Sequence, residues 1–187
     1  MRRHLSILTL LGCVAAGEVP VVRPTDPTPA VPAATAPVIA ALPLRGQGRY
    51  TYFWFKIYDV RCYLPAGVAA TAALGEHPRR LSFTWLRGCT AKEQAEANIE
   101  HCAKRLGNTP KAEVDAGVAA INPLWPEVKE NDVLDLIYRP GVGTTMALNG
   151  RDLGTVPGAA FAKVQFSIWL GDDPIDSDLR KKLLGIK

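Results

Sequence analysis

The prolines of this 187-residue chain are unevenly distributed, and their distribution limits where a folded domain can lie. Seven of the 15 prolines fall within residues 20–43. Proline fixes φ and removes a backbone donor, so such a stretch favours extended, polyproline-like backbone over regular helices or sheets. We therefore expect residues 14–43 to be a flexible Pro/Ala-rich tether, and residues 44–187 to form one domain of ordinary size.

The first 13 residues have the order of an export signal. Two arginines precede a short apolar stretch over residues 5–11, as in a signal peptide. Gly12 and Cys13 follow this stretch, and Leu10-Leu11-Gly12-Cys13 resembles a bacterial lipobox, whose cysteine is acylated. We predict that residues 1–13 direct export to the periplasm and that Cys13 anchors the protein to the membrane through a lipid. Cleavage without lipid near residues 15–16 is the alternative.

Charge and cysteine content limit the other partners. A formal net charge of +4 is too small a surplus to indicate nucleic acid, and no apolar run approaches the ~20 residues that span a bilayer. Apart from Cys13, the cysteines are Cys62, Cys89 and Cys102, which permit one disulfide without choosing the pair. No His/Cys set has metal-ligand spacing, so we expect no metal and no cofactor.

The most strand-like part of the chain is residues 49–64, which are rich in aromatic and β-branched types. The run is too long for one short strand, so we predict two strands with a bend near Trp54 and Phe55. Every second residue from Tyr58 to Leu64 is apolar, which places that face of the second strand against a core. The other face mixes polar and apolar residues, and we expect it to be partly exposed.

The rest of the domain alternates between strand and helix signals. Thr90 and Glu93 form a capping box at a helix start, and Asn149-Gly150 is a strong signal for a two-residue hairpin. On the helix that Thr90 begins, an apolar stripe is expected at Ala95, Ile99, Cys102 and Leu106. The predicted strands are 80–87, 132–138, 144–148 and 151–156. The predicted helices are 91–106, 113–121, one between Gly158 and Gly171, and a short last helix that Asp176 or Ser177 caps and that runs through Leu184. This order predicts an α+β fold, a mainly antiparallel sheet with helices packed on one face.

Generic catalytic motifs are absent from the sequence. It has no nucleophile elbow, P-loop or complete dinucleotide fingerprint. Gly46-Gln47-Gly48 lacks a third glycine and precedes a strand, so we interpret it as a turn. Asp172, Asp173 and Asp176 lie beside Gly and Pro, which favours a solvated, helix-capping segment over acid–base chemistry.

An ordered set of short segments is more specific than any one of them. The set is Gly46-x-Gly48-Arg49, Phe55-Lys56-Ile57-Tyr58-Asp59-Val60, Tyr63-Leu64, Leu148-Asn149-Gly150 and Ile168-Trp169-Leu170-Gly171-Asp172-Asp173-Pro174, followed by Asp178-Leu179 and Leu183-Leu184-Gly185. It resembles the chalcone isomerase-like family, in particular its bacterial branch, over residues 44–185. The resemblance implies an open-faced sandwich whose ligand cleft lies between the sheet and the helices.

The positions that carry chalcone cyclisation in the plant enzymes are mostly different here. The resemblance places Arg49 at the catalytic arginine, but Tyr58 stands at a threonine position and Ile168 near another. Gln94 and His101 stand where the family has a tyrosine and an asparagine. Without these positioned hydrogen-bond donors, the site would neither orient the substrate nor stabilise the charge that develops in the transition state. The sequence therefore argues against chalcone cyclisation.

Arg49 and Tyr58 instead resemble the non-catalytic, fatty-acid-binding branch, in which an arginine and a tyrosine hold a carboxylate. A guanidinium matches a carboxylate bidentately, and a tyrosine hydroxyl adds a neutral donor. The alternative is that Arg49 is a surface strand residue, or that it pairs with an internal carboxylate such as Asp59 or Asp135.

Three hypotheses about function follow. The leading one is an exported, non-catalytic domain that binds a small apolar carboxylate such as a fatty acid through Arg49, Tyr58, Gln94, His101 and Ile168. The second is an intramolecular lyase or isomerase with Arg49 as electrophile, Tyr58 as proton donor and His101 as base. The third is an envelope protein that binds a partner and has a vestigial, closed cleft.

Overall fold

A computed structural model describes residues 42–186, and its sheet has six antiparallel strands in the order of the chain. Each strand pairs only with its neighbours in sequence, so β1 and β6 are the two edges. The strands are β1 (Leu44–Tyr52), β2 (Phe55–Tyr63), β3 (Arg79–Trp85), β4 (Val133–Arg139), β5 (Gly143–Leu148) and β6 (Arg151–Val156).

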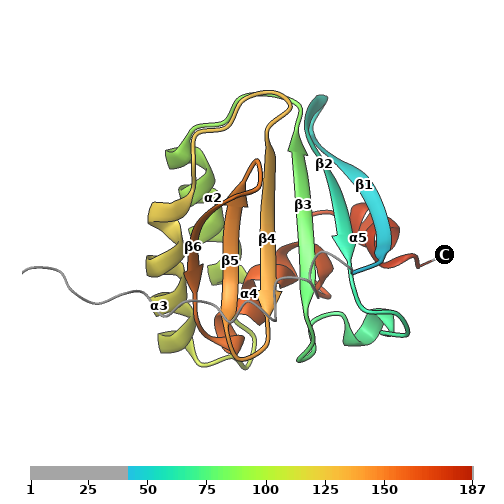
Figure 1. The fold of residues 1–187 in the computed structure, drawn as a ribbon, viewed down its shortest axis with the longest axis vertical. Helices are drawn as coiled ribbons and strands as arrows, with labels where there is room; N and C mark the ends of the chain where they lie inside the picture. The colour runs from blue at the N-terminus through green and yellow to red at the C-terminus, as the bar shows by residue number, and fades with distance from the viewer. Residues whose placement is uncertain (1–41, 187) are drawn as a thin grey trace, which may run out of the picture. The chain divides into compact units, whose positions relative to one another are not determined.

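The helices lie on one face of this sheet (Figure 1). They are α2 (Ala91–Lys104), α3 (Lys111–Ile121), α4 (Ala159–Leu170) and α5 (Ser177–Leu184), with short 3₁₀ turns at Ala70–Ala72 and Asn122–Leu124. The helices α2 and α3 follow one another between β3 and β4, and α5 packs against the edge strand β1. The predicted α+β class, with an antiparallel sheet and helices on one face, is confirmed.

Local signals placed most boundaries correctly. Thr90 caps α2 through the predicted box, because its hydroxyl accepts from the backbone N–H of Glu93 while the Glu93 carboxylate accepts from the backbone N–H of Thr90. Asn149 and Gly150 both have positive φ, 51° and 81°, and turn the chain from β5 into β6. The predicted bend in the first strand pair is the Phe53-Trp54 turn between β1 and β2.

The helix-facing side of the sheet forms the core, as the alternation in β2 predicts. Tyr58, Val60, Cys62 and Leu64 are all buried, whereas Arg61, which points to the other side, is exposed. Because successive side chains of a strand point to opposite faces, this pattern determines which face of β2 meets the helices.

The glycines at the start of β1 are not a turn, contrary to the sequence interpretation. They lie within the strand and pack against α5. A Cβ built on Gly46 would lie 2.1 Å from the carbonyl oxygen of Lys182, and one on Gly48 would lie 2.7 Å from Leu179 Cδ1. Glycine is needed at both positions because α5 approaches the strand backbone so closely.

The buried side of α2 also differs from the prediction. Cys102 is buried as predicted, but Ile99, expected in the same apolar stripe, is 49% exposed, and the polar side chains of Gln94 and Asn98 are buried instead. The reason is that the facing segments offer hydrogen-bond partners to a polar side. Gln94 donates to the Pro126 carbonyl at 2.5 Å, and Asn98 donates to the Asn122 side chain at 3.2 Å.

The expectations about the N-terminal segment, the cysteines, the membrane and metals are considered together. The leader with Cys13, and residues 14–41 of the predicted 14–43 tether, lie outside residues 42–186 and stay predictions. Cys62, Cys89 and Cys102 are all free thiols in the structure. No helix within the described range is long and apolar enough to cross a bilayer. The same residues contain no cluster of three or more His, Cys, Asp or Glu side chains that could hold a metal ion.

Candidate functional site

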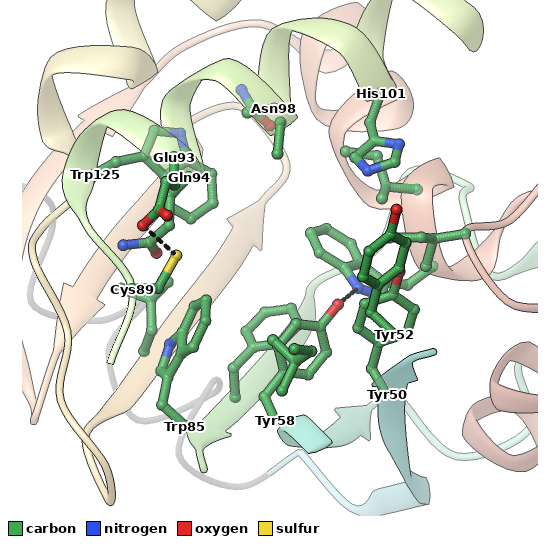
Figure 2. Close-up of a pocket in the computed structure, with 17 residues that line it drawn as sticks. Tyr50, Tyr52, Tyr58, Trp85, Cys89, Glu93, Gln94, Asn98, His101 and Trp125 are labelled. Atoms are coloured by element: carbon green, nitrogen blue, oxygen red, sulfur yellow. Dashed lines mark hydrogen bonds between the residues drawn. The ribbon is translucent and has the colours of Figure 1, made fainter. Parts of the chain in front are cut away.

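A pocket of about 260 Å³ lies between the helix-facing side of the sheet and α2 (Figure 2). Strands β1 to β4 supply its floor, and the connector after α3 and the end of α4 complete the wall. Its lining is dominated by aromatic residues, which are Tyr50, Tyr52, Tyr58, Phe83, Trp85, Trp125 and Trp169. Such a surface favours an apolar ligand with a flat or flexible body.

Tyr58 lies at the centre of this aromatic floor. Its ring stacks on Tyr50 with centroids 5.2 Å apart, and it meets Phe83 and Trp85 edge-on at 5.1 and 5.5 Å. Its hydroxyl accepts a hydrogen bond from Trp169 Nε1 at 2.9 Å (Figure 2). Burial raises the pKa of Tyr58 well above its ordinary value, so the phenol stays neutral. The Tyr58 O–H therefore remains a neutral hydrogen-bond donor.

The His101 side chain points from α2 toward the tyrosines of β1 at one end of the pocket (Figure 2). Its Nδ1 lies 3.3 Å from Arg105 Nη1. Because a guanidinium can only donate, Nδ1 accepts and the proton of the neutral ring is on Nε2. Desolvation, with a further contribution from Arg105, lowers the pKa of His101 below its usual value. At neutral pH the ring is uncharged and its Nε2–H is a donor.

The other end of the pocket carries neutral polar atoms. Gln94 Nε2 donates to two backbone carbonyls, which orients its Oε1 as an acceptor. That oxygen and the Nε1 atoms of Trp85 and Trp125 are buried without a hydrogen-bond partner among the described residues. Glu93 lies at this end too, but its carboxylate is held by Thr90 in the capping box, which lowers its pKa. The negative charge of Glu93 disfavours an anion at this end, whereas the two indole N–H groups can donate to a neutral acceptor.

Arg49 is not in the pocket, and its expected position in the cleft is wrong. It lies on the opposite face of the sheet, where its Nε and Nη2 donate to the two Asp59 carboxylate oxygens at 2.6 and 2.9 Å. The ion pair is solvent-exposed and raises the pKa of Arg49 while lowering that of Asp59. Tyr50, the next residue, faces Tyr58 across the strand pair instead. This is the surface alternative that the sequence left open.

The structure does bring the other predicted positions together. Tyr58, Gln94, His101 and Ile168 all line the one pocket. Sequence reasoning missed the remaining aromatic walls, above all Tyr50, Trp85, Trp125 and Trp169. The alternation of β1 could have indicated Tyr50, because it has the same parity as Gly46 and Gly48. Trp125 lies in a connector and had no comparable signal.

The comparisons with known proteins agree with this fold. The model of the family described as chalcone isomerase-like matches residues 30–185. The chain therefore belongs to the chalcone isomerase-like family. No curated protein matches it significantly in sequence.

Among solved structures, it is similar to the crystal structure of a fatty-acid binding protein from Arabidopsis thaliana, with a TM-score of 0.62 and 16% sequence identity. The likeness covers 76% of this chain and 86% of the plant chain. At that identity the likeness concerns the fold.

Proposed function

We propose that this protein is a binding protein for a small apolar carboxylate, such as a fatty acid, and that the ligand occupies the aromatic pocket. The observation that carries the proposal is the pocket itself, with seven aromatic side chains and a volume of about 260 Å³. This volume lies just below the roughly 300–1,000 Å³ of typical ligand pockets, which favours a short acyl chain or part of a longer one. The similar plant structure is that of a fatty-acid binding protein, which supports the same class of ligand.

The carboxylate would lie at the His101 end. Among the described residues that line the pocket, none is a lysine or arginine, and an unpaired anion buried among aromatic rings would be costly. His101 Nε2–H and the tyrosines of β1 can donate to a carboxylate that stays close to solvent. The acyl chain would then extend over Tyr58 toward Trp85.

Two other hypotheses have less support. A lyase mechanism that uses Arg49 as electrophile lacks that group in the pocket, because Arg49 pairs with Asp59 on the far face. The third hypothesis expects a cleft that is packed shut, and a pocket of this size argues against it. Export to the periplasm and lipidation of Cys13 belong to this proposal as well, and they rest on the N-terminal sequence alone.

Titration of delipidated protein with saturated fatty acids of increasing length tests the proposal. Ala97 lines the pocket but is otherwise exposed, so Ala97→Trp should block the pocket without disturbing the core. We expect it to weaken binding by at least about tenfold, which corresponds to ~1.4 kcal/mol. Ala103→Trp, an exposed change on the same helix, and Arg49→Ala should leave the affinity unchanged.

Absence of any acyl ligand in native mass spectra and in titrations of the wild type would overturn the proposal. So would equal affinities for the wild type and Ala97→Trp. A loss of affinity in Arg49→Ala would contradict the assignment of the site to this face of the sheet. Turnover of a chalcone in the same samples would favour the lyase instead.

A further inference from the structure

The tip of the β1–β2 hairpin is built from four consecutive aromatic residues, which we call the aromatic tip, Tyr52-Phe53-Trp54-Phe55. Their exposed fractions are 57%, 73%, 78% and 49%. Across residues 42–186, seven large hydrophobic side chains are exposed, and these four are adjacent in the sequence. Single exposed apolar residues are ordinary, but a contiguous exposed patch marks an interaction surface.

The backbone conformation of this turn does not favour aromatic residues. Phe53 has φ of 53°, a left-handed conformation in which a bulky side chain is unfavourable. A two-residue hairpin normally has glycine or asparagine at such a position, as this sheet has at Asn149-Gly150. Strained conformations of this kind cluster at functional sites. The turn therefore carries Phe53 at the expense of local stability.

The surroundings of the aromatic tip combine apolar rings with positive charge. The four rings contact one another in succession, with neighbouring centroids 4.6 to 5.8 Å apart. The Arg87 guanidinium lies 5.2 Å from the centre of the Phe55 ring, and Lys56 is exposed directly after the tip. Aromatic rings with cations behind them match the headgroup region of a bilayer, where Trp and Tyr concentrate and basic residues meet lipid phosphates.

We propose that the aromatic tip docks the protein on a lipid bilayer by inserting Phe53 and Trp54 into the interfacial region. A stable protein–protein interface needs roughly 800 Å² from each partner, supplied by about 20–30 residues. A two-residue turn with four aromatic side chains is too small for that purpose, but it is sufficient to anchor a domain in a lipid interface, where each inserted ring contributes separately.

The aromatic tip adjoins the pocket, because Tyr52 belongs to both. Docking would place the pocket next to lipid, from which an apolar ligand could enter. This consequence rests on the proposed function, whereas the docking itself does not.

Co-flotation with vesicles tests the docking. The samples are the full chain with Cys13→Ser throughout, so that no acyl anchor contributes, and vesicles of phosphatidylcholine with or without phosphatidylglycerol. The test variant is Phe53→Gly with Trp54→Ser, which replaces the strained turn by a favourable one and should fold at least as stably. We expect its partition coefficient to fall by about tenfold or more through loss of the two apolar side chains.

Ile99→Ser is the matched control. It removes an apolar side chain of α2 that is 49% exposed but lies outside the aromatic tip, and it should leave partitioning unchanged. A second readout is local to the aromatic tip. Trp54 is exposed while Trp85, Trp125 and Trp169 are buried, so a blue shift on vesicle binding and quenching by brominated lipids should disappear in Trp54→Phe.

Equal partitioning of the parent and the Phe53→Gly/Trp54→Ser variant would overturn the docking proposal, as would Trp54 emission unaffected by vesicles. Loss of self-association in this variant without any change in lipid binding would assign the tip to a second copy of the chain and overturn it too. Fatty-acid affinity measured without vesicles should be the same in both proteins, so failure of docking and failure of ligand binding are separable.

Discussion

At the scale of single residues, Tyr58 connects the parts of the pocket wall that come from distant segments. Its ring contacts strands β1 and β3, and its hydroxyl accepts from Trp169 at the end of α4. Both side chains are buried. Removal of the hydroxyl would leave the buried indole N–H without the partner that the structure gives it.

Tyr58→Phe should lower the free energy of unfolding by about 1–3 kcal/mol, because it leaves the buried Trp169 donor unsatisfied. The control is Tyr63→Phe on the same strand, which removes a hydroxyl on the opposite face while keeping the ring that Arg80 contacts. Urea denaturation of both variants measures the difference. Equal losses of stability would show that the Tyr58 hydroxyl has no particular structural role.

At the scale of elements, the pocket depends on how closely the helices approach one another and the sheet. Gly117 of α3 packs against Phe161 of α4, where an added Cβ would lie 2.2 Å from the ring atom Cγ. This contact holds α3 against the helix whose far end carries Ile168 and Trp169 into the pocket. The spacing of these two helices therefore affects the pocket wall.

Gly117→Ala should destabilise the protein by roughly 1–3 kcal/mol through overpacking, although the same change in an exposed helix stabilises it by about 1 kcal/mol. Gly88→Ala is the comparison, because its added Cβ would come no closer than 3.4 Å, to the Val128 carbonyl. Thermal unfolding of the two variants should show a lower melting temperature only for Gly117→Ala. A rise in melting temperature for that variant would mean that Phe161 moves aside easily.

At the scale of the whole molecule, the pH dependence of stability should reflect His101. Its pKa is lowered in the folded protein by desolvation and by Arg105. The unfolded chain therefore binds more protons than the folded protein between the folded pKa and the unfolded value of about 6.5. Stability should fall as the pH decreases from about 6.5 through that interval and then level off.

His101→Gln should remove this component of the pH profile, measured as unfolding free energy between neutral and mildly acidic pH. A fatty-acid carboxylate beside the imidazole would favour its charged form and raise the pKa again. Binding should then be accompanied by proton uptake in the wild type and not in the variant. An unchanged profile in His101→Gln would show that other groups determine stability in this range.

The elements and their order could be predicted from the sequence, since these depend on local physics. The Thr90–Glu93 box and the Asn149-Gly150 turn satisfy the backbone by themselves, and the alternation from Tyr58 to Leu64 needs only one buried face. The family resemblance added the location of a cleft between sheet and helices, and four of its five proposed positions line the pocket.

The face of β1 that meets the helices depends on contacts between distant segments, and the sequence did not predict it. Side chains alternate with a period of two, so a shift of one residue between Arg49 and Tyr50 exchanges a cation for an aromatic ring in the pocket. The pairing register and the packing of Gly46 and Gly48 on α5 settle that choice, and both depend on contacts distant in sequence. The polar side of α2 became its buried side for the same reason, because the partners of Gln94 and Asn98 come from the connector after α3.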